Sequence, residues 1–595
     1  MTTDAWGIDD GWFGTDGRWH TPPPETVDAI RSVMGDPVGR PVWAVRPGAA
    51  DPLQVPCRLT LEDGRDLGEV PRLPPDLPLG IHEIAPADGG PTTTLLAGPG
   101  RCHLPDRLHE WGVTVQVPTA RSTHSWGIGD LADVRAIATW IHGRGGRVVA
   151  LSPLHAPTPV APIPASPYYP SSRRWRSPLL IRVDEVGPSL PPLESLGTEA
   201  RRLLVDPIVR RDECWSRQAR ALELLWARLD DRERTAAAEW SRSHGEELQR
   251  WTTFCALAEV HGPSWGTWPA DLRNPSAPAV AKAAADLVDR RAFHAWLQQL
   301  VDEQLARAGS QGVHLVQDLA VGVDPHGADA WAHQDLLAQG FSIGAPPDEF
   351  ETDGQSWGLP PWIPWRLRDA GYRPLAALLR AAMVEGGGLR IDHVMGLTRL
   401  FWVPEGGRPA DGAYVRFAGR ELLELVALES ARAEAFVVGE DLGTVEEGLR
   451  DELHHRRILS TKVVWFEDEP PEGWPDQSLA MVTTHDLPTL AGMRRGTDAP
   501  PAMRARLDRL AGPLDPMAAD DLAIEVHHRL GRSPAALALA TLEDLLGVEA
   551  RPNLPGTTDD DRPNWSVALP VLVDDLPTHA GANAVLDGLA EGRAT

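Results

Sequence analysis

The sequence predicts an α/β fold, a (β/α)8 barrel with helical insertions that follows a small β-rich N-terminal region. After about residue 110, strand-like apolar runs alternate with helical stretches, which is typical of β/α units. Several of these runs end in carboxylates or histidines, as the strands of barrel enzymes do at their active-site face. A chain of 595 residues is too long for one ordinary core, so we expect two domains, 1–110 and 111–595.

The first domain begins with a predicted short helix. In "PPPETVDAIRSVMG" a run of prolines precedes an amphipathic stretch and Gly35 follows it, which are start and stop signals of a helix. From residue 41 to about 108, short apolar runs are separated by Pro, Gly and an Asp-Gly turn. This pattern is typical of an all-β region, and we expect a small sandwich-like domain.

The second domain supplies eight candidate barrel strands, and the last of them could equally be a helix. They are 113–117, 147–154, 313–321, 389–394, 436–442, 461–467, 479–486 and 536–548. The usual barrel has about 250 residues, so large insertions are required. The stretch 190–305 has no convincing strand. Its apolar residues Trp215, Ala219, Leu222, Trp226 and Leu229 fall on one helical face, so we expect a helical insertion there.

The composition excludes several classes of partner. A net charge of −27 argues against nucleic acid and anionic membranes and fits a neutral substrate. No run of 18 apolar residues predicts a membrane helix, and the acidic start lacks a signal pattern, so we expect a cytoplasmic protein. Four widely spaced cysteines indicate reduced thiols rather than a zinc site. The 23 tryptophans weakly favour a carbohydrate ligand.

Charged residues gather at the predicted carboxyl ends of four strands. "LVQD" ends in Asp318, "LRIDH" in Asp392 and His393, "VVGED" in Glu440 and Asp441, and "MVTTHD" in His485 and Asp486. A single Asp-His pair at a strand end is most often a capping or hydrogen-bonding feature. Acidic ends on the fourth, fifth and seventh candidate strands together indicate an active site.

Two of these carboxylates have contrasting surroundings. Arg390 and Asp392 are two residues apart on one strand, so the guanidinium should lower the pKa of Asp392 and keep it ionised, as a nucleophile requires. Glu440 follows the apolar run 436–439, which should raise its pKa and suit a proton donor. One ionised and one protonated carboxyl group are the requirement of retaining glycosidic-bond chemistry. Asp486 offers a third carboxylate that could bind sugar hydroxyls and favour a cationic transition state.

Two other barrel chemistries remain open from these residues. Asp318, Asp392, His393 and His485 could bind a metal, but the His-x-His pair that barrel metallohydrolases usually carry on an early strand is missing. A lysine-dependent aldolase would need one of only two lysines. Lys462 is predicted at the amino-terminal start of its strand, the wrong end for an active site.

The motifs resemble those of the 4-α-glucanotransferases (amylomaltases, or disproportionating enzymes), glycoside hydrolase family 77, in the larger bacterial version. The resemblance spans nearly the whole chain. "RIDHVMG", "VGEDLGTV" and "TTHDLPT" look like the nucleophile, acid/base and third-carboxylate motifs. Further similar segments are "SWGIGDLADV" (125–134), "SPYYPSS" (166–172), "IGAPPDEFETDGQSWGLPPW" (343–362) and "NLPGTTDDDRPNW" (553–565). One departure is "RRWRSPLLI" (173–181), where the family usually has small residues and Asn before Pro-Leu.

The resemblance implies roles for individual residues. Asp392 would be the nucleophile, Glu440 the acid/base and Asp486 the transition-state stabiliser. Arg390 and His485 would hold the sugar at the cleavage subsite. The remaining implied substrate-binding residues are His393, Asp318, Trp357, Ser166, Tyr168 and Asn553. The N-terminal β region resembles the extra domain of larger bacterial members.

The implied activity is transfer of an α-1,4-glucan segment to the 4-hydroxyl of glucose or a maltooligosaccharide, in carbohydrate metabolism. No cofactor or metal is expected for these steps. The alternatives are an α-1,4-glucan hydrolase on the same barrel and a non-catalytic glucan-binding barrel. A pure binder would not need all three carboxylates. The sequence alone leaves donor length, acceptor range, oligomeric state and pathway open.

Overall fold

The computed structural model describes residues 2–14, 17–48, 52–347, 351–383, 386–511, 519–558 and 561–594. Eight parallel strands close into a barrel and follow one another around it in chain order, which confirms the predicted fold class. They are β8 (Glu110–Val115), β9 (Val148–Leu151), β12 (His314–Leu319), β15 (Gly388–Ile391), β18 (Phe436–Gly439), β19 (Ile458–Val463), β20 (Ser478–Met481) and β21 (Leu537–Thr541). Strands β18, β20 and β21 are buried throughout, as expected for a barrel covered by helices.

All eight candidate runs overlap a barrel strand, but several boundaries differ from the prediction. Strand β20 ends at Met481, so His485 and Asp486 lie in the loop that follows it. The run 536–548, which could have been a strand or a helix, contains both. Its first part forms β21, and the short helix α17 (Leu542–Leu545) follows directly. Strand β19 covers Ile458–Val463, which places Lys462 near its carboxyl end. The prediction for Lys462 was therefore wrong, because the strand begins earlier than its apolar core suggests.

The chain divides into two compact units, each of which is described by itself. Unit 1 comprises residues 1–104, 321–325 and 333–458, and unit 2 comprises 105–320, 326–332 and 459–595. Unit 1 contains β15 and β18, and unit 2 contains β8, β9, β12, β20, β21 and nearly all of β19.

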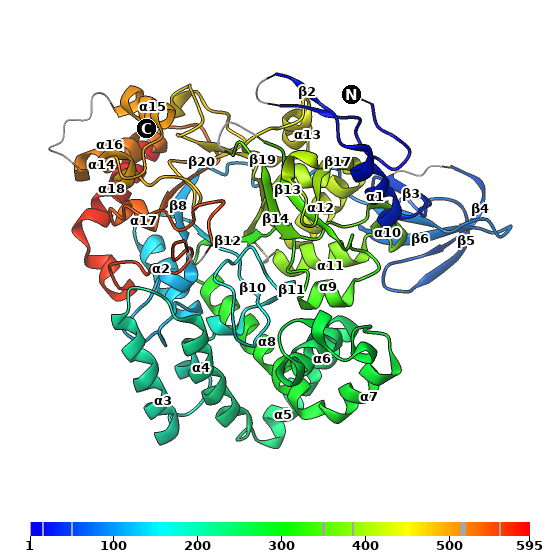
Figure 1. Ribbon diagram of the computed structural model, residues 1–595, viewed down its shortest axis with the longest axis horizontal. Helices are drawn as coiled ribbons and strands as arrows, with labels where there is room; N and C mark the ends of the chain where they lie inside the picture. The colour runs from blue at the N-terminus through cyan, green and yellow to red at the C-terminus, as the bar shows by residue number, and fades with distance from the viewer. Residues whose placement is uncertain are drawn as a thin grey trace. The chain divides into compact units, whose positions relative to one another are not determined.

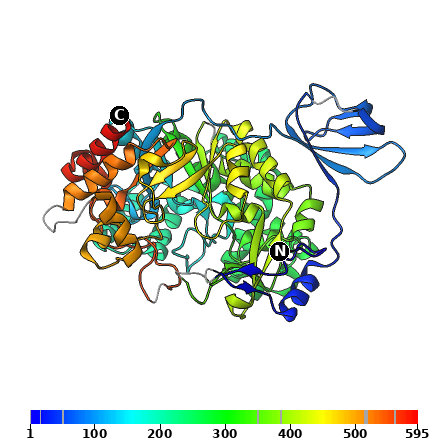
Figure 2. The same ribbon diagram turned by 90° about the horizontal axis from the view of Figure 1, so that it is seen from above.

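Unit 1 begins with the hairpin of β1 (Trp12–Phe13) and β2 (Trp19–His20), followed by helix α1 (Pro24–Met34), which has proline at its start and Gly35 at its end as predicted. A five-stranded sheet follows, blue in Figure 2, with the order β3-β7-β6-β4-β5. Its strands are β3 (Val42–Val45), β4 (Pro52–Thr60), β5 (Asp66–Arg72), β6 (Gly80–Pro86) and β7 (Thr93–Ala97). The described strands form one sheet rather than the two layers of a sandwich. A sequence pattern of short strand-like runs between turns is compatible with either a single sheet or a sandwich, so it cannot distinguish the two.

A second sheet in unit 1 was not predicted. Its order is β14-β13-β16-β17, and all its pairs are antiparallel. The strands are β13 (Phe341–Ala345), β14 (Gln355–Leu359), β16 (Arg399–Pro404) and β17 (Ala413–Arg416). The remaining helices of unit 1 are α10 (Pro364–Asp369), α11 (Arg373–Ala382), α12 (Gly419–Ala433) and α13 (Leu449–His455).

Helices fill the stretch of unit 2 between β11 and β12, and Figure 1 shows several of them grouped together below the barrel strands of that unit. They are α3 (Pro191–Arg201), α4 (Arg211–Trp226), α5 (Asp231–Ser243), α6 (Gly245–His261), α7 (Pro278–Asp286) and α8 (Val288–Gly309). Trp215, Leu222 and Trp226 of the predicted helical face are buried on α4. Unit 2 also contains β10 (His155–Ala156), β11 (Ser172–Arg176), α2 (Leu131–Gly143), α9 (Ala328–Ala332), α14 (Leu490–Arg495), α15 (Pro501–Ala511), α16 (Ala519–Gly531) and α18 (Ala580–Ala594).

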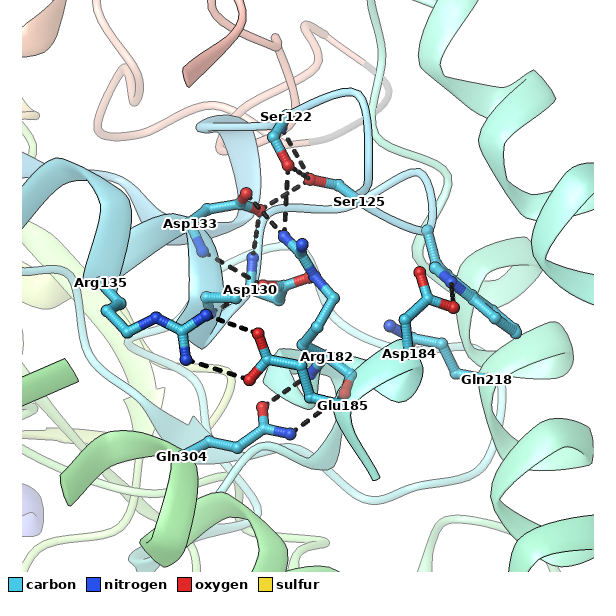
Figure 3. A network of polar contacts seen from close by, with 12 residues as sticks. Ser122, Ser125, Asp130, Asp133, Arg135, Arg182, Asp184, Glu185, Gln218 and Gln304 are labelled. Atoms are coloured by element: carbon cyan, nitrogen blue, oxygen red, sulfur yellow. Dashed lines mark hydrogen bonds and ion pairs between the residues drawn. The ribbon is translucent and has the colours of Figure 1, made fainter. Parts of the chain in front are cut away.

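A buried ion network fixes the loop between β8 and α2 (Figure 3). Arg182 binds the carboxylates of Asp130 and Asp133, and its Nη2 also donates to Oγ of Ser122 at 3.2 Å. Asp130 in turn caps α2 by accepting from the backbone N–H of Ala132. Burial and the neighbouring charge of Asp133 raise the pKa of Asp130 to about 7. The network ties the segment that resembles the family's first barrel loop to the segment around Arg182.

All four cysteines are buried and free, as expected for reduced thiols. Within the part of the chain that the structure describes, no helix is both long enough and apolar enough to span a membrane.

Candidate active site

The neighbouring strands β15 and β18 of unit 1 place the carboxylates of Asp392 and Glu440 side by side at their carboxyl ends. The strands pair in parallel, with Arg390 opposite Val438 and Ile391 opposite Gly439. Asp392 and Glu440 are the next residues on the two chains. The backbone N–H of Glu440 donates to the carbonyl oxygen of Ile391, and that of Val394 donates to the carbonyl oxygen of Glu440. Backbone pairing thus continues past both strand ends and places the two carboxylates beside each other.

Asp392 has the partner that the sequence predicted. Nη2 of Arg390 lies 3.1 Å from Oδ1 of Asp392, and the two side chains are only 18% and 20% exposed. A cation at this distance in a partly dehydrated site favours the ionised form of a carboxyl group. Asp392 is therefore suited to act as an anionic nucleophile.

Glu440 has the opposite electrostatic character. Burial raises the pKa of Glu440 to about 7, with a further contribution from the negative charge of Asp392, while Arg390 and two backbone N–H groups oppose the rise. Oε2 accepts from the N–H of His393 at 2.9 Å, and Oε1 accepts from the N–H of Leu442 at 2.8 Å. Each oxygen keeps a second lone pair, so the carboxyl group can carry a proton while it stays oriented.

The donor to Glu440 has an unusual backbone conformation. His393 has φ 48° and ψ 60°, in the left-handed region that non-glycine residues rarely adopt. This conformation turns the chain sharply after β15 and directs the His393 N–H at Glu440. Burial and the charge of Arg399 lower the pKa of the His393 ring to about 4, so the imidazole is neutral at physiological pH.

Trp357 lies next to His393, on the edge strand β14 of the four-stranded sheet. The two rings meet edge to face, with 5.2 Å between their centroids. Nε1 of Trp357 donates to Oε1 of Gln355 at 2.9 Å, and the indole is half-buried. Because the indole is half-buried, part of its surface is accessible to a ligand. Residues 348–350 of the motif that contains Trp357 lie outside the described residues.

In unit 2, the loop after β20 presents His485 and Asp486. Nε2 of His485 lies 3.3 Å from Oδ2 of Asp486, and Nδ2 of Asn553 donates to Oδ1 of Asp486 at 2.7 Å. The backbone N–H of Asn553 also donates to the carbonyl oxygen of His485. Asn553 therefore orients Asp486 and braces the loop that carries it. Asp486 remains 41% exposed, so one face of its carboxylate is accessible.

Asp318 and Tyr168 form a second polar pair in unit 2. Asp318 is buried in β12, and its Oδ2 accepts from the hydroxyl of Tyr168 at 2.6 Å. The ring of Tyr168 packs against His485, with 4.9 Å between centroids. Ser166 starts the same turn, because its Oγ accepts from the N–H of Tyr168 at 3.2 Å. The structure thus brings Ser166, Tyr168, Asp318 and His485 together.

Trp565, Glu543 and Asp544 were missed by the sequence analysis. Trp565 contacts both His485 and Tyr168. Glu543 and Asp544 lie in the first turn of α17, and burial raises the pKa of each to about 7. Glu543 lies close enough to His485 for their charges to interact. The sequence "TLED" predicts only the start of a helix. It contains no pattern that would identify Glu543 and Asp544 as buried carboxyl groups.

The alternative chemistries fit the observed positions less well. Nζ of Lys462 forms an ion pair of 3.0 Å with Oε1 of Glu467, and the lysine side chain is 17% exposed. An ammonium group in such a pair is not the free amine that Schiff-base chemistry needs. Within the described part of the chain, no group of three or more His, Cys, Asp and Glu residues is arranged to hold a metal ion.

Comparison with known proteins finds clear relatives of this chain. The family model described as 4-alpha-glucanotransferase matches residues 115–573. A 4-alpha-glucanotransferase of Mycobacterium tuberculosis is 40% identical over 605 residues, which cover 89% of this chain and 82% of that protein. A Haemophilus influenzae 4-alpha-glucanotransferase is 32% identical over 567 residues, with 82% and 80% covered. The crystal structure of amylomaltase from Corynebacterium glutamicum superposes with a TM-score of 0.86 at 27% identity and covers 98% of both chains.

Proposed function

The chain belongs to the 4-alpha-glucanotransferase family, and we propose that it transfers segments of α-1,4-glucans to the 4-hydroxyl of glucose or maltooligosaccharides. The reaction is a retaining double displacement. The observation that carries this assignment is the pair on β15 and β18, in which Asp392 is bound by Arg390 while burial raises the pKa of Glu440 to about 7.

In the first step Asp392 attacks the anomeric carbon, and Glu440 donates its proton to the departing glycosidic oxygen. The C–O bond of the glucan breaks as the Asp392–carbon bond forms. A covalent glucosyl ester results, and the shortened glucan leaves with the proton. Each carboxyl group begins this step in the ionisation state that its surroundings favour.

The second step needs Glu440 as a base, and the first step itself prepares it. Once Asp392 is esterified, its negative charge no longer raises the pKa of Glu440, whereas Arg390 and the two N–H donors still lower it. Glu440 can then take the proton of an acceptor 4-hydroxyl while that oxygen attacks the ester carbon. The α configuration is restored after two inversions.

The residues of unit 2 support the same reaction in this proposal. Asp486, oriented by Asn553, stabilises the positive charge that develops on the sugar in the transition state. His485, Tyr168 and Asp318 bind sugar hydroxyls beside it, and Trp357 of unit 1 supplies an aromatic face. The four buried free cysteines fit a reducing compartment, so we place the protein in the cytoplasm.

The test is the product pattern from maltotriose. Transfer yields glucose together with maltopentaose and longer chains, and reducing ends hardly increase because each broken bond is replaced. A hydrolase would give a stoichiometric rise in reducing ends with only glucose and maltose. That result would reject the transferase in favour of hydrolysis on the same barrel.

A further inference from the structure

Trp565 belongs to a cluster of three rings in unit 2. Its indole centroid is 4.9 Å from that of His485 and 5.4 Å from that of Tyr168, and these two rings also contact each other. Trp565 itself is only 6% exposed. The indole is therefore a buried support behind two half-buried rings.

The backbone of Trp565 is held in an unfavourable conformation. Its φ of 59° is in the left-handed region, where a bulky side chain is a genuine outlier. Such a conformation persists only when surrounding contacts impose it. The N–H of Trp565 donates to the carbonyl oxygen of Pro552, next to Asn553, which fixes one side of the peptide.

Arg211 fixes the other side. This arginine is the first residue of α4, and it is 8% exposed. Its Nη2 donates to the carbonyl oxygen of Trp565 at 2.6 Å, and its Nη1 donates to Oγ of Ser566 at 2.8 Å. Charge-assisted hydrogen bonds from a buried guanidinium are strong and directional. Arg211 therefore holds Trp565 in the conformation that presents the indole to His485 and Tyr168.

The same end of α4 also holds the segment that carries Tyr168. Oδ1 of Asp212 accepts from the backbone N–H of Ile163 at 2.8 Å, and Nε1 of Trp215 donates to the carbonyl oxygen of Pro159 at 2.9 Å. Arg211 and Ser166 line one small cavity. The first turn of α4 thus connects the two loops whose rings meet at His485.

We infer that Arg211 and Trp565 are positioning residues, through which the helical stretch between β11 and β12 sets the geometry of Tyr168 and His485 at the sugar-binding site. This inference rests on the proposed function, because it gives Tyr168 and His485 contact with the substrate. Neither Arg211 nor Trp565 contacts the substrate itself. They act by fixing the rings that do.

The experiment compares four variants in the full chain. Arg211→Met removes the hydrogen bonds but keeps the aliphatic stem, and Arg211→Lys restores one donor. Trp565→Gly removes the indole while it relaxes the left-handed backbone, since glycine adopts this conformation freely. Arg217→Met is the matched control on the same helix, because Arg217 donates to the carbonyl oxygen of Glu213 within α4. We measure kcat and KM for maltotriose, together with the melting temperature.

We expect kcat/KM to fall roughly tenfold to a hundredfold in Arg211→Met and Trp565→Gly, because misplacement by about 1 Å is enough for such a loss. The KM should rise in both, Arg211→Lys should recover most of the activity, and Arg217→Met should equal the wild type. A purely structural role would lower kcat in proportion to the folded fraction with KM unchanged, and that result overturns the inference. Unchanged kinetics in Arg211→Met would also overturn it.

The proposed function is tested separately by the wild type. If the wild-type protein transfers glucan from maltotriose and the variants behave as it does, only the inference about Arg211 and Trp565 fails. If the wild-type protein forms no products longer than maltotriose, the proposed function fails and the inference fails with it.

Discussion

The backbone N–H of His393 donates a hydrogen bond of 2.9 Å to Oε2 of Glu440, and His393 directly follows Asp392 in the chain. One peptide turn therefore connects the two carboxylates. The bond depends on the left-handed conformation of His393, which has φ 48°. Any change that relaxes this turn should disturb the orientation of Glu440.

The conformation of His393 can be tested by stability. Glycine adopts φ near 48° without a steric penalty, whereas alanine pays about 1 kcal/mol or more. His393→Gly should thus be more stable than His393→Ala by about 1 kcal/mol, although glycine usually destabilises a folded chain. Urea unfolding of both variants measures the difference. Equal stability, or a more stable alanine variant, would show that the left-handed conformation is not retained in solution.

The raised pKa of Glu440 predicts the alkaline side of the pH profile. Its proton is required for departure of a sugar oxygen and is lost as the pH rises through about 7. Above that pH, kcat/KM for maltotriose should fall about tenfold per pH unit. With α-glucosyl fluoride, whose fluoride needs little protonation, this fall should be absent from the first step. A similar alkaline fall for both donors would assign the titration to another group.

The two carboxylate roles can be separated by trapping. With α-glucosyl fluoride, Glu440→Gln should form the covalent intermediate and then stall, because it lacks a base for the second step. Asp392→Asn should form none. Mass spectrometry of the intact protein should show one added glucosyl unit on Glu440→Gln alone. The reverse labelling would exchange the roles of the two residues.

Much of the barrel and of the carboxylate pair is predictable because the signals are local. Arg390 and Asp392 are two residues apart, and Glu440 directly follows an apolar run, so their surroundings can be inferred from a few neighbours. Strand boundaries were less certain. The sequence pattern places Lys462 at the wrong end of β19 because the predicted run begins at Thr461, whereas the strand begins at Ile458 and its polar residues Ser460 and Thr461 interrupt the apolar pattern.

Contacts between distant segments left no such signal. Trp565 lies hundreds of residues from both Arg211 and Tyr168 in the sequence, so no short pattern links it to them. The four-stranded sheet was missed for a related reason. Between β14 and β16 the chain also forms two helices and the barrel strand β15, so no short pattern announces their shared sheet.

Trp357 should contribute to substrate use more than to stability, because it is half-buried on an edge strand. Aromatic contacts are typically worth about 0.5–1.5 kcal/mol, so Trp357→Ala should lower kcat/KM roughly threefold to tenfold. Trp402 of the same sheet is fully buried and is the matched control. Trp402→Ala should reduce stability by about 3–5 kcal/mol. A large stability loss in Trp357→Ala with normal kinetics would mark Trp357 as a core residue instead.

The N-terminal segment of unit 1 is bound to the loop that follows Glu440 by an ion network. The carboxylate of Asp9 is 1% exposed, and its Oδ1 accepts from Nε of Arg416 at 2.6 Å. Arg416 also binds Glu446 at 2.7 Å, and Arg399 lies within 4 Å of both carboxylates. Two guanidinium groups are thus balanced by two carboxylates, one of them from the N-terminal segment.

Asp9→Asn should therefore destabilise unit 1 and loosen the loop that contains Glu446. The variant leaves two largely buried cations with a single anion, and breaking such a pair costs about 3 kcal/mol. Hydrogen exchange of the backbone should accelerate in residues 441–448, and the unfolding midpoint in urea should fall. Asp411→Asn is the control, since Asp411 pairs with the exposed Arg408 and should leave both measurements unchanged. If Asp9→Asn lowers stability without faster exchange in 441–448, the network stabilises the N-terminal segment but does not order the loop beyond Glu440.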